Sequence, residues 1–190
     1  MLRALVGTCV VAGCLALVPS PSSAQEIIHA LTGTISSING ATKTITVLQD
    51  FGSSGTYQEL SNPKTRVSFD KHMEADTTAA EAFDKQGAYV IVFYFGTDND
   101  RTAVAFKNLG AGPFQSTEGT VTHFDGHARA LTVQDESGKE QTFKIDAGTV
   151  AETGVGAVPG LKLQAEKGDK VRIVSSKGEG APTALFVRDL

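Results

Sequence analysis

The sequence predicts an all-β protein with two tandem small antiparallel OB-like β-barrels and one short helix in the first barrel. Two observations predict this fold. An internal repeat spans nearly the whole chain after residue 25, and short apolar segments alternate with turn-forming residues. Closure of each sheet into a barrel is expected because it removes the exposed edges through which short strands aggregate.

The repeat consists of ordered blocks at constant offsets. Residues 33–47 contain Gly-Thr-Ile, Ile-Asn-Gly and Ile-Thr-Val, and Gly-Thr-Val, Phe-Asp-Gly and Leu-Thr-Val follow 86 positions later, within residues 119–133. Residues 102–109 then align without a gap with residues 183–190, at an offset of 81. We interpret the pattern as a duplication. It predicts a first barrel at residues 25–112 and a second at 114–190, divided at Gly-Ala-Gly-Pro.

Each copy is expected to fold as strands joined by short turns. In the first copy, Asn39 and Gly40 tolerate positive φ and predict a tight hairpin. The alanine-rich segment 74–85 predicts the single helix. The strands are expected at residues 32–38, 44–49, 57–60, 66–69, 88–95 and 102–108.

The ordered pattern of these motifs resembles exported bacterial domains of unknown function with an OB-like barrel. The resemblance covers both copies, because each contains Gly-Thr-Ile/Val, Ile/Phe-Asn/Asp-Gly, Ile/Leu-Thr-Val and a later Gly-x-x-Val. It implies a barrel fold and an extracytoplasmic compartment. It transfers no catalytic residue, because the shared motifs are structural.

The N-terminal segment predicts export. Residues 4–18 are apolar and follow Arg3, and Ser-Ser-Ala at 22–24 fits a cleavage site, so residues 1–24 are expected to be a signal peptide removed before Gln25. The apolar run is too short for a membrane anchor, and no transmembrane segment is expected after cleavage. The protein is thus predicted to be periplasmic or secreted. As an alternative, Val-Ala-Gly-Cys at 11–14 resembles a lipobox, which would anchor a lipoprotein through Cys14.

Composition excludes several classes of function. Cys9 and Cys14 both lie in the predicted signal peptide, so the mature chain would have no disulfide and no thiolate chemistry. Loss of Arg3 leaves 16 of the 17 basic residues against 21 acidic ones, a net charge of −5. That sign disfavours nucleic-acid binding, which depends on neutralising phosphates with Lys and Arg.

No motif predicts an enzyme or a cofactor. The sequence contains neither Gly-x-Ser-x-Gly nor His-Glu-x-x-His, and no tryptophan to line a sugar cleft. The first hypothesis is a non-catalytic binding or interaction module with an unknown protein or small-molecule partner in the cell envelope. A periplasmic metal-handling protein and a hydrolase of unrecognised type are the alternatives.

The metal alternative depends on histidines. His123 and His127 have i, i+4 spacing, but they flank a turn rather than lie on a helix. A two-residue loop at Asp-Gly, residues 125–126, would direct the two rings to opposite faces of a hairpin, so no metal site is expected there. A longer loop could bring the two rings together. His72, next to Met73, is a further candidate.

One strand of the first copy carries an apolar stripe. Val90 and Val92 align with apolar residues 81 positions later, so this face is expected in the barrel core. On the other face, Lys170 and Arg172 stand at two of the aligned positions, which indicates an outward face in the second copy. The stripe is either a surface for a ligand or partner, or is covered by the predicted helix or the second barrel. Its residues are Tyr89, Ile91, Phe93 and Phe95.

Overall fold

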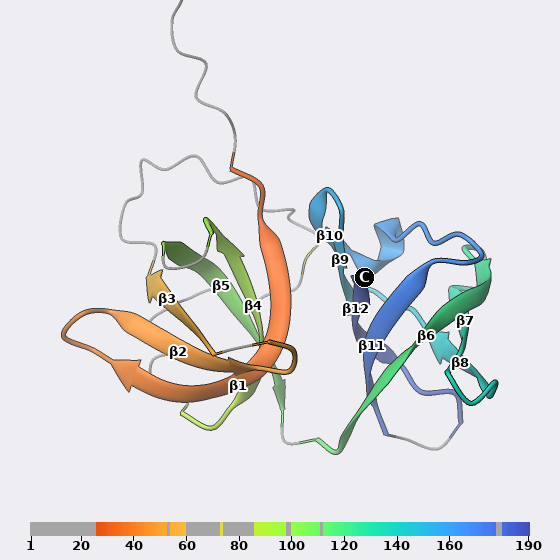
Figure 1. Cartoon of the computed structure of the whole chain (residues 1–190), viewed down its shortest axis with the longest axis horizontal. Helices are drawn as coiled ribbons and strands as arrows, with labels where there is room; N and C mark the ends of the chain where they lie inside the picture. Colours follow the sequence, from red (N-terminus) through yellow and green to blue (C-terminus); the bar gives the residue numbers. More distant parts are fainter. Residues whose placement is uncertain are drawn as a thin grey trace, which may run out of the picture.

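The structure, a computed structural model of the 190-residue chain, describes residues 26–52, 54–59, 73, 86–97, 100–110, 112–177 and 180–190. It consists of two β-units that lie side by side (Figure 1). The predicted signal peptide, the expected helix at 74–85, the expected strand at 66–69 and His72 lie outside the described residues. In the described part of the chain, no helix has the length and apolar character needed to span a membrane.

The first unit is a closed five-stranded barrel, which confirms the predicted fold class. Its strands are β1 (His29–Asn39), β2 (Thr44–Gln49), β3 (Gly55–Glu59), β4 (Tyr89–Phe95) and β5 (Arg101–Gly110). The order around the barrel is β1-β2-β3-β5-β4. All neighbours are antiparallel except β3 and β5, which are parallel.

Alternating side chains fill this barrel, because successive residues of a strand point to opposite faces. Gly33 is required where β1 passes closely over β2: a Cβ there would collide with the carbonyl oxygen of Leu48. The buried core residues are Leu31, Ile35, Ile45, Val47, Tyr57, Val90, Val92, Ala103 and Phe106.

The second unit is a seven-stranded sheet in the order β10-β9-β12-β11-β6-β7-β8. Its elements are β6 (Phe114–Asp125), β7 (Ala130–Gln134), β8 (Glu140–Lys144), β9 (Val150–Thr153), β10 (Gly156–Pro159), the 3₁₀ helix η1 (Gly160–Lys162), β11 (Lys170–Ser176) and β12 (Ala184–Asp189). β8 approaches the start of β12, where Lys144 forms one parallel bridge with Thr183. Its own core includes Val121, Leu131, Val133, Phe143, Ile145, Val171, Ile173 and Val187.

The hairpin between β6 and β7 has a four-residue loop, so the two-residue loop expected at residues 125–126 is wrong. Asp125 pairs with Ala130. The Asp125 Oδ1 atom accepts hydrogen bonds from the backbone N–H groups of His127 (2.9 Å) and Ala128 (2.8 Å), and Arg129 has a φ of 53°. The carboxylate therefore organises a longer turn that ends in a left-handed residue.

Candidate functional site

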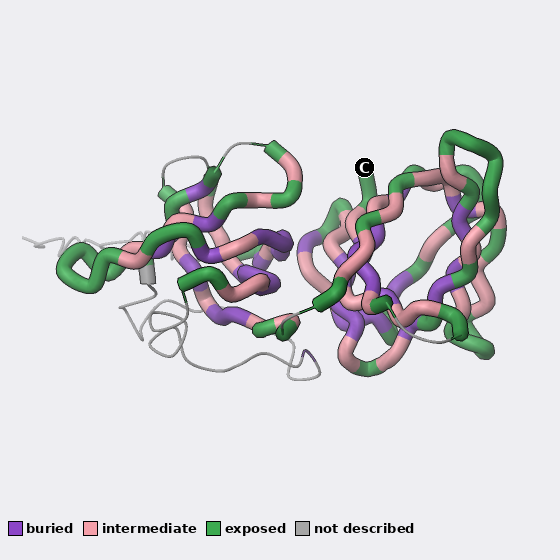
Figure 2. Tube along the Cα trace, turned by 90° about the horizontal axis from the view of Figure 1, so that it is seen from below, coloured by how far each residue is buried: buried purple, intermediate pink, exposed green. Residues whose placement is uncertain are grey.

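The apolar stripe of β4 lies between the two units. Ile91 and Phe93 have no exposed surface, whereas Tyr89 and Phe95 are half-buried. Figure 2 shows buried segments on the sides of both units that face each other. The stripe packs in one apolar cluster, here called the seam, that includes Val150, Val174 and Phe186 of the second unit. The second unit therefore covers Ile91 and Phe93, which is one of the alternatives that the sequence left open.

The face of β11 that carries Lys170 and Arg172 is not solvent-exposed along its whole length, although their charges predict this. Lys170 is exposed, but Val174, on the same face two positions beyond Arg172, is buried in the seam. Arg172 lies at the edge, where its guanidinium lies over the Phe51 ring and its Nε donates to Glu118 Oε1 at 2.7 Å. A long arginine side chain covers apolar surface while its charged end stays near water.

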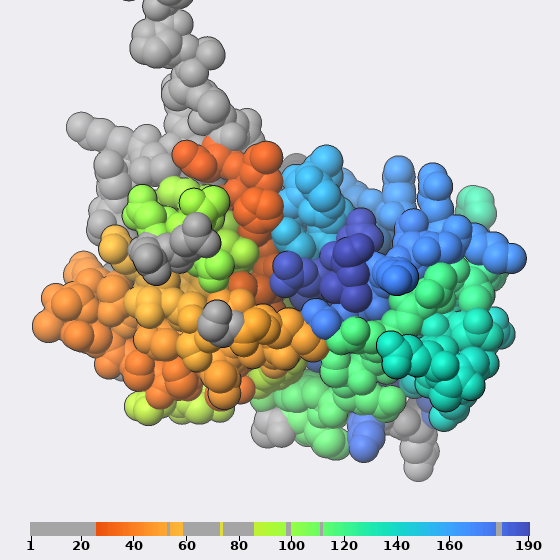
Figure 3. Space-filling model, in the orientation of Figure 1, coloured from red at the N-terminus to blue at the C-terminus, as the bar shows by residue number. Residues whose placement is uncertain are grey.

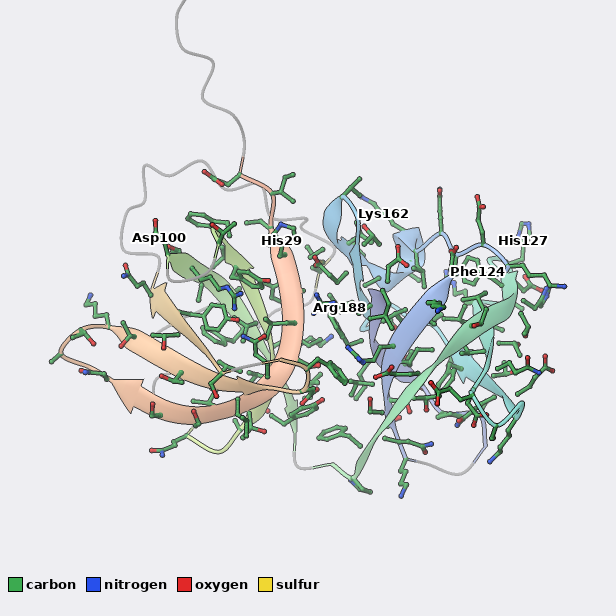
Figure 4. The ribbon with its side chains drawn as sticks, in the orientation of Figure 1. His29, Asp100, Phe124, His127, Lys162 and Arg188 are labelled. Atoms are coloured by element: carbon green, nitrogen blue, oxygen red, sulfur yellow. The ribbon has the colours of Figure 1, made fainter. Side chains whose placement is uncertain are left out.

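A half-buried carboxylate joins the units at one end of the seam. Glu152 on β9 accepts through Oε2 a hydrogen bond from the backbone N–H of Ala30 at 2.7 Å, and its Oε1 lies 2.7 Å from His29 Nδ1. Arg188 of β12 is the strand neighbour of Glu152 (Figure 4). Burial raises the pKa of Glu152 above its ordinary value, although its contacts with His29, Ala30 and Arg188 act in the opposite direction.

A cleft of about 320 Å³ opens at another edge of the same seam. Figure 3 shows the surfaces of the first unit and the second unit in direct contact. Residues of both units line the cleft, from the end of β2, from β4, from β6 and from β11. They are Asp50, Phe51, Tyr89, Phe114, Gln115, Ser116 and Val174.

Asp50 provides the charge of this cleft. Its Oδ2 atom accepts a hydrogen bond from Thr32 Oγ1 at 2.6 Å and another from the Tyr89 hydroxyl. Burial, followed by the hydrogen bond to Asp50 and its charge, raises the pKa of Tyr89 above the ordinary tyrosine value, so Tyr89 remains a neutral donor. Asp50 itself is exposed, so its carboxylate is open to a solute.

Aromatic rings form much of the remaining wall. The rings of Tyr89 and Phe114 lie with their centroids 4.9 Å apart, tilted by 33°. Phe51 contributes a third ring to the lining. Gln115 and Ser116 add an amide and a hydroxyl from β6. The cleft thus combines apolar surface with a few polar groups, as small-molecule sites usually do.

Another cluster of polar and aromatic side chains lies in the first barrel. The guanidinium carbon of Arg101 lies 5.7 Å from the ring centroid of Tyr57 and 5.5 Å from that of Tyr94, and its Nη1 donates to the Tyr57 hydroxyl at 3.2 Å. Burial raises the pKa of Tyr57 to about 12, although the charge of Arg101 opposes this shift. Because Tyr57 is completely buried, we interpret the group as part of the barrel core.

Among the described residues, His29 meets one ligating side chain, Glu152, and no histidine joins a group of three such side chains. His127 lies in the loop at the end of the second unit that is far from His29 (Figure 4), and His123 is on β6. Both rings are exposed and lie close enough to Asp125 to lower its pKa, after the backbone N–H groups that are the larger cause. Among the residues described, no three histidine, cysteine or acidic side chains form a group that could hold a metal ion.

Sequence reasoning identified Tyr89 but missed its partners in the cleft. Asp50 and Phe51 directly follow an expected strand, and Phe114 begins the predicted second barrel. Phe114 joins the other cleft residues only because the two units pack together. No protein-family model matches the chain, and no curated protein matches it significantly. The geometry of the cleft is therefore the main basis for a function.

Proposed function

We propose that this chain is an exported, non-catalytic binding module that holds a small ligand in the cleft between its two units. The observation that carries the proposal is the composition of the cleft: one carboxylate, three aromatic rings, an amide and a hydroxyl line a space of about 320 Å³. That volume is within the range of small-molecule sites, which favour positions between structural units. The N-terminal sequence supports export, with residues 1–24 as the signal peptide.

We also propose that the two units arose by duplication, as the repeat indicates. The strand pairings support it: β1 pairs with β2 and β4, and β6 correspondingly pairs with β7 and β11. The hairpin of the first unit supports it further. There the Asn39 side chain accepts hydrogen bonds from Ala41 and Thr42, and Lys43 has a φ of 52°, each 86 positions before its counterpart in the second hairpin.

The alternatives have less support. A metal-handling role would require converging ligands, and the described residues contain no such group. A hydrolase would require an activated nucleophile or a second carboxylate in the cleft, whereas Asp50 is the single acidic residue in its lining. We therefore favour binding without chemistry, in the cell envelope, with no nucleic-acid partner and no cofactor.

A cleft-filling substitution tests the proposal. Ser116→Trp places a large ring in the cleft from an exposed position of β6. Thr142→Trp adds the same ring at an exposed position of β8, outside the cleft, and is the matched control. The exported protein is ¹⁵N-labelled and screened by NMR against choline, benzoate and benzyl alcohol, which represent a cation, an anion and a neutral aromatic.

We expect at least one probe to shift the backbone amide signals of Gln115 and Ser116 in a saturable way. The shifts at Gln115 should disappear in Ser116→Trp and remain in Thr142→Trp. If no probe moves these amides, or if the shifts remain in the filled variant, the cleft is not the binding site.

A further inference from the structure

We infer that the cleft selects an organic cation, a small solute with an alkylammonium group, held by the Asp50 carboxylate and the surrounding aromatic rings. This inference rests on the proposed function and specifies the class of its ligand. The first support is charge. Asp50 is the single ionisable acid among the seven lining residues, and none of them is basic. The lining is thus negative, and an anion would meet repulsion with no basic side chain in the lining to offset it.

The second support is the geometry of the carboxylate. Thr32 and Tyr89 both donate to Oδ2, so they fix the orientation of the Asp50 side chain. The hydrogen bonds found for the described residues leave Oδ1 as an acceptor for a solute. A carboxylate has about four lone-pair sites, so this capacity is substantial. An ammonium group that approaches Oδ1 would make a charge-assisted contact.

The third support is the aromatic wall. A cation near a ring face is attracted by the ring quadrupole, and several rings together form a cage for alkylammonium groups. Phe51 already makes such a contact within the protein, because the Arg172 guanidinium lies over its ring. Glu118 pairs with Arg172 through Nε at 2.7 Å, so this cation is neutralised locally and does not cancel the charge of Asp50.

The test compares a cation with a neutral molecule of the same shape. Choline has a positively charged quaternary nitrogen where 3,3-dimethylbutan-1-ol has a neutral quaternary carbon, and the two molecules otherwise have the same shape. Each is titrated into the ¹⁵N-labelled exported protein, and the dissociation constant is taken from the Gln115 and Ser116 amide shifts. We expect choline to bind about tenfold or more tightly than the neutral analogue, because only choline gains the carboxylate and cation–π contributions.

Two variants separate the contributions of charge and rings. Asp50→Asn keeps an acceptor for Thr32 and Tyr89 but removes the charge, and it should weaken choline binding about tenfold while leaving the neutral analogue unchanged. Glu136→Gln, at the position that the repeat aligns with Asp50, removes the same charge from the second unit and should leave both affinities unchanged. Phe114→Leu should weaken choline binding with Asp50 intact. Circular dichroism melts show whether each variant is folded.

Equal affinity for choline and its neutral analogue would overturn the inference, and so would unchanged choline binding in Asp50→Asn. Either result leaves the cleft as a binding site. Saturable shifts with benzoate but not with choline would also overturn the cation assignment and retain the cleft. If no probe shifts the two amides, both the inference and the proposed function are wrong.

Discussion

Substitution of Ile91 by lysine tests whether the seam joins the units. Ile91 has no exposed surface and packs in the seam with Phe93, Val150 and Val174. A lysine there either buries an unpaired ammonium group or forces the units apart. An uncompensated buried charge costs roughly 3–5 kcal/mol. One kcal/mol corresponds to about 2–4 °C for a chain of this size, so the melting temperature should fall by roughly 10 °C.

The matched control is Leu48→Lys, which places the same side chain on β2 at a position that is 55% exposed. Its free energy of unfolding should be within about 0.5 kcal/mol of that of the wild type. Differential scanning calorimetry of the three proteins gives the comparison directly. Because both units contribute to one apolar cluster, Ile91→Lys should also speed amide hydrogen exchange in the second unit at β9 and β12. If Ile91→Lys and Leu48→Lys have the same melting temperature, the two units do not pack together through the seam in solution.

Further predictions concern buried ionisable groups, close strand crossings and the N-terminus. Because the folded pKa of Glu152 is raised, its contribution to the free energy of unfolding is complete below about pH 4.5 and is lost as the pH rises through the folded pKa. In Glu152→Gln, denaturant titrations at several pH values should no longer show this decrease of the free energy of unfolding with pH. Because burial raises the pKa of Tyr57 from 10.0 to about 12, the free energy of unfolding should decrease by about 3 kcal/mol as the pH rises through that interval. Denaturant titrations of Tyr57→Phe over the same interval should show a smaller decrease. Gly33→Ala and Gly119→Ala should each destabilise the fold by roughly 1–3 kcal/mol in urea titrations, since either Cβ would collide with a backbone carbonyl of the adjacent strand. Mass spectrometry of the exported protein should give a chain that begins at Gln25, whereas a mass with an acylated cysteine would indicate a lipoprotein.

The strands could be predicted because their signals are local. Apolar residues alternate with threonine along the first four residues of β2, whereas β4 is a continuous apolar run. The expected strand at 44–49 coincides with β2 (Thr44–Gln49). Val90 and Val92 lie in the barrel core, whereas Ile91 and Phe93 lie on the opposite face, as the period of two requires.

The hairpin loop was not predictable from the Asp-Gly pair alone. That dipeptide favours a two-residue loop, but the Asp125 side chain instead accepts hydrogen bonds from His127 and Ala128. The turn then needs a left-handed residue at Arg129, which the sequence does not signal, because arginine is not a residue that favours positive φ. A competing side-chain contact thus determined the loop length.

The candidate site was only partly predictable, because its residues meet by tertiary packing. Tyr89 was identified through its strand, but its neighbour Phe114 is 25 positions later and its hydrogen-bond partner Asp50 is 39 positions earlier. Nothing in the local pattern of Asp50-Phe51 distinguishes it from an ordinary strand end. The burial of the stripe likewise depends on the second unit, whose position relative to β4 no periodicity specifies.

The arrangement of the seam explains why the charged residues of β11 were misleading. The repeat aligns Phe93 with Val174 and Ala105 with Phe186, and all four lie in the seam. The two units therefore meet through equivalent faces, as the subunits of a twofold-symmetric dimer do. The two units differ in sequence, however, so equivalent positions of this interface have different neighbours. Arg172 stands 81 positions after Ile91 and lies at the edge of the seam, where its guanidinium lies over Phe51 and pairs with Glu118. A charge at one copy then shows that the position is peripheral in that unit, and it does not show that the face is exposed.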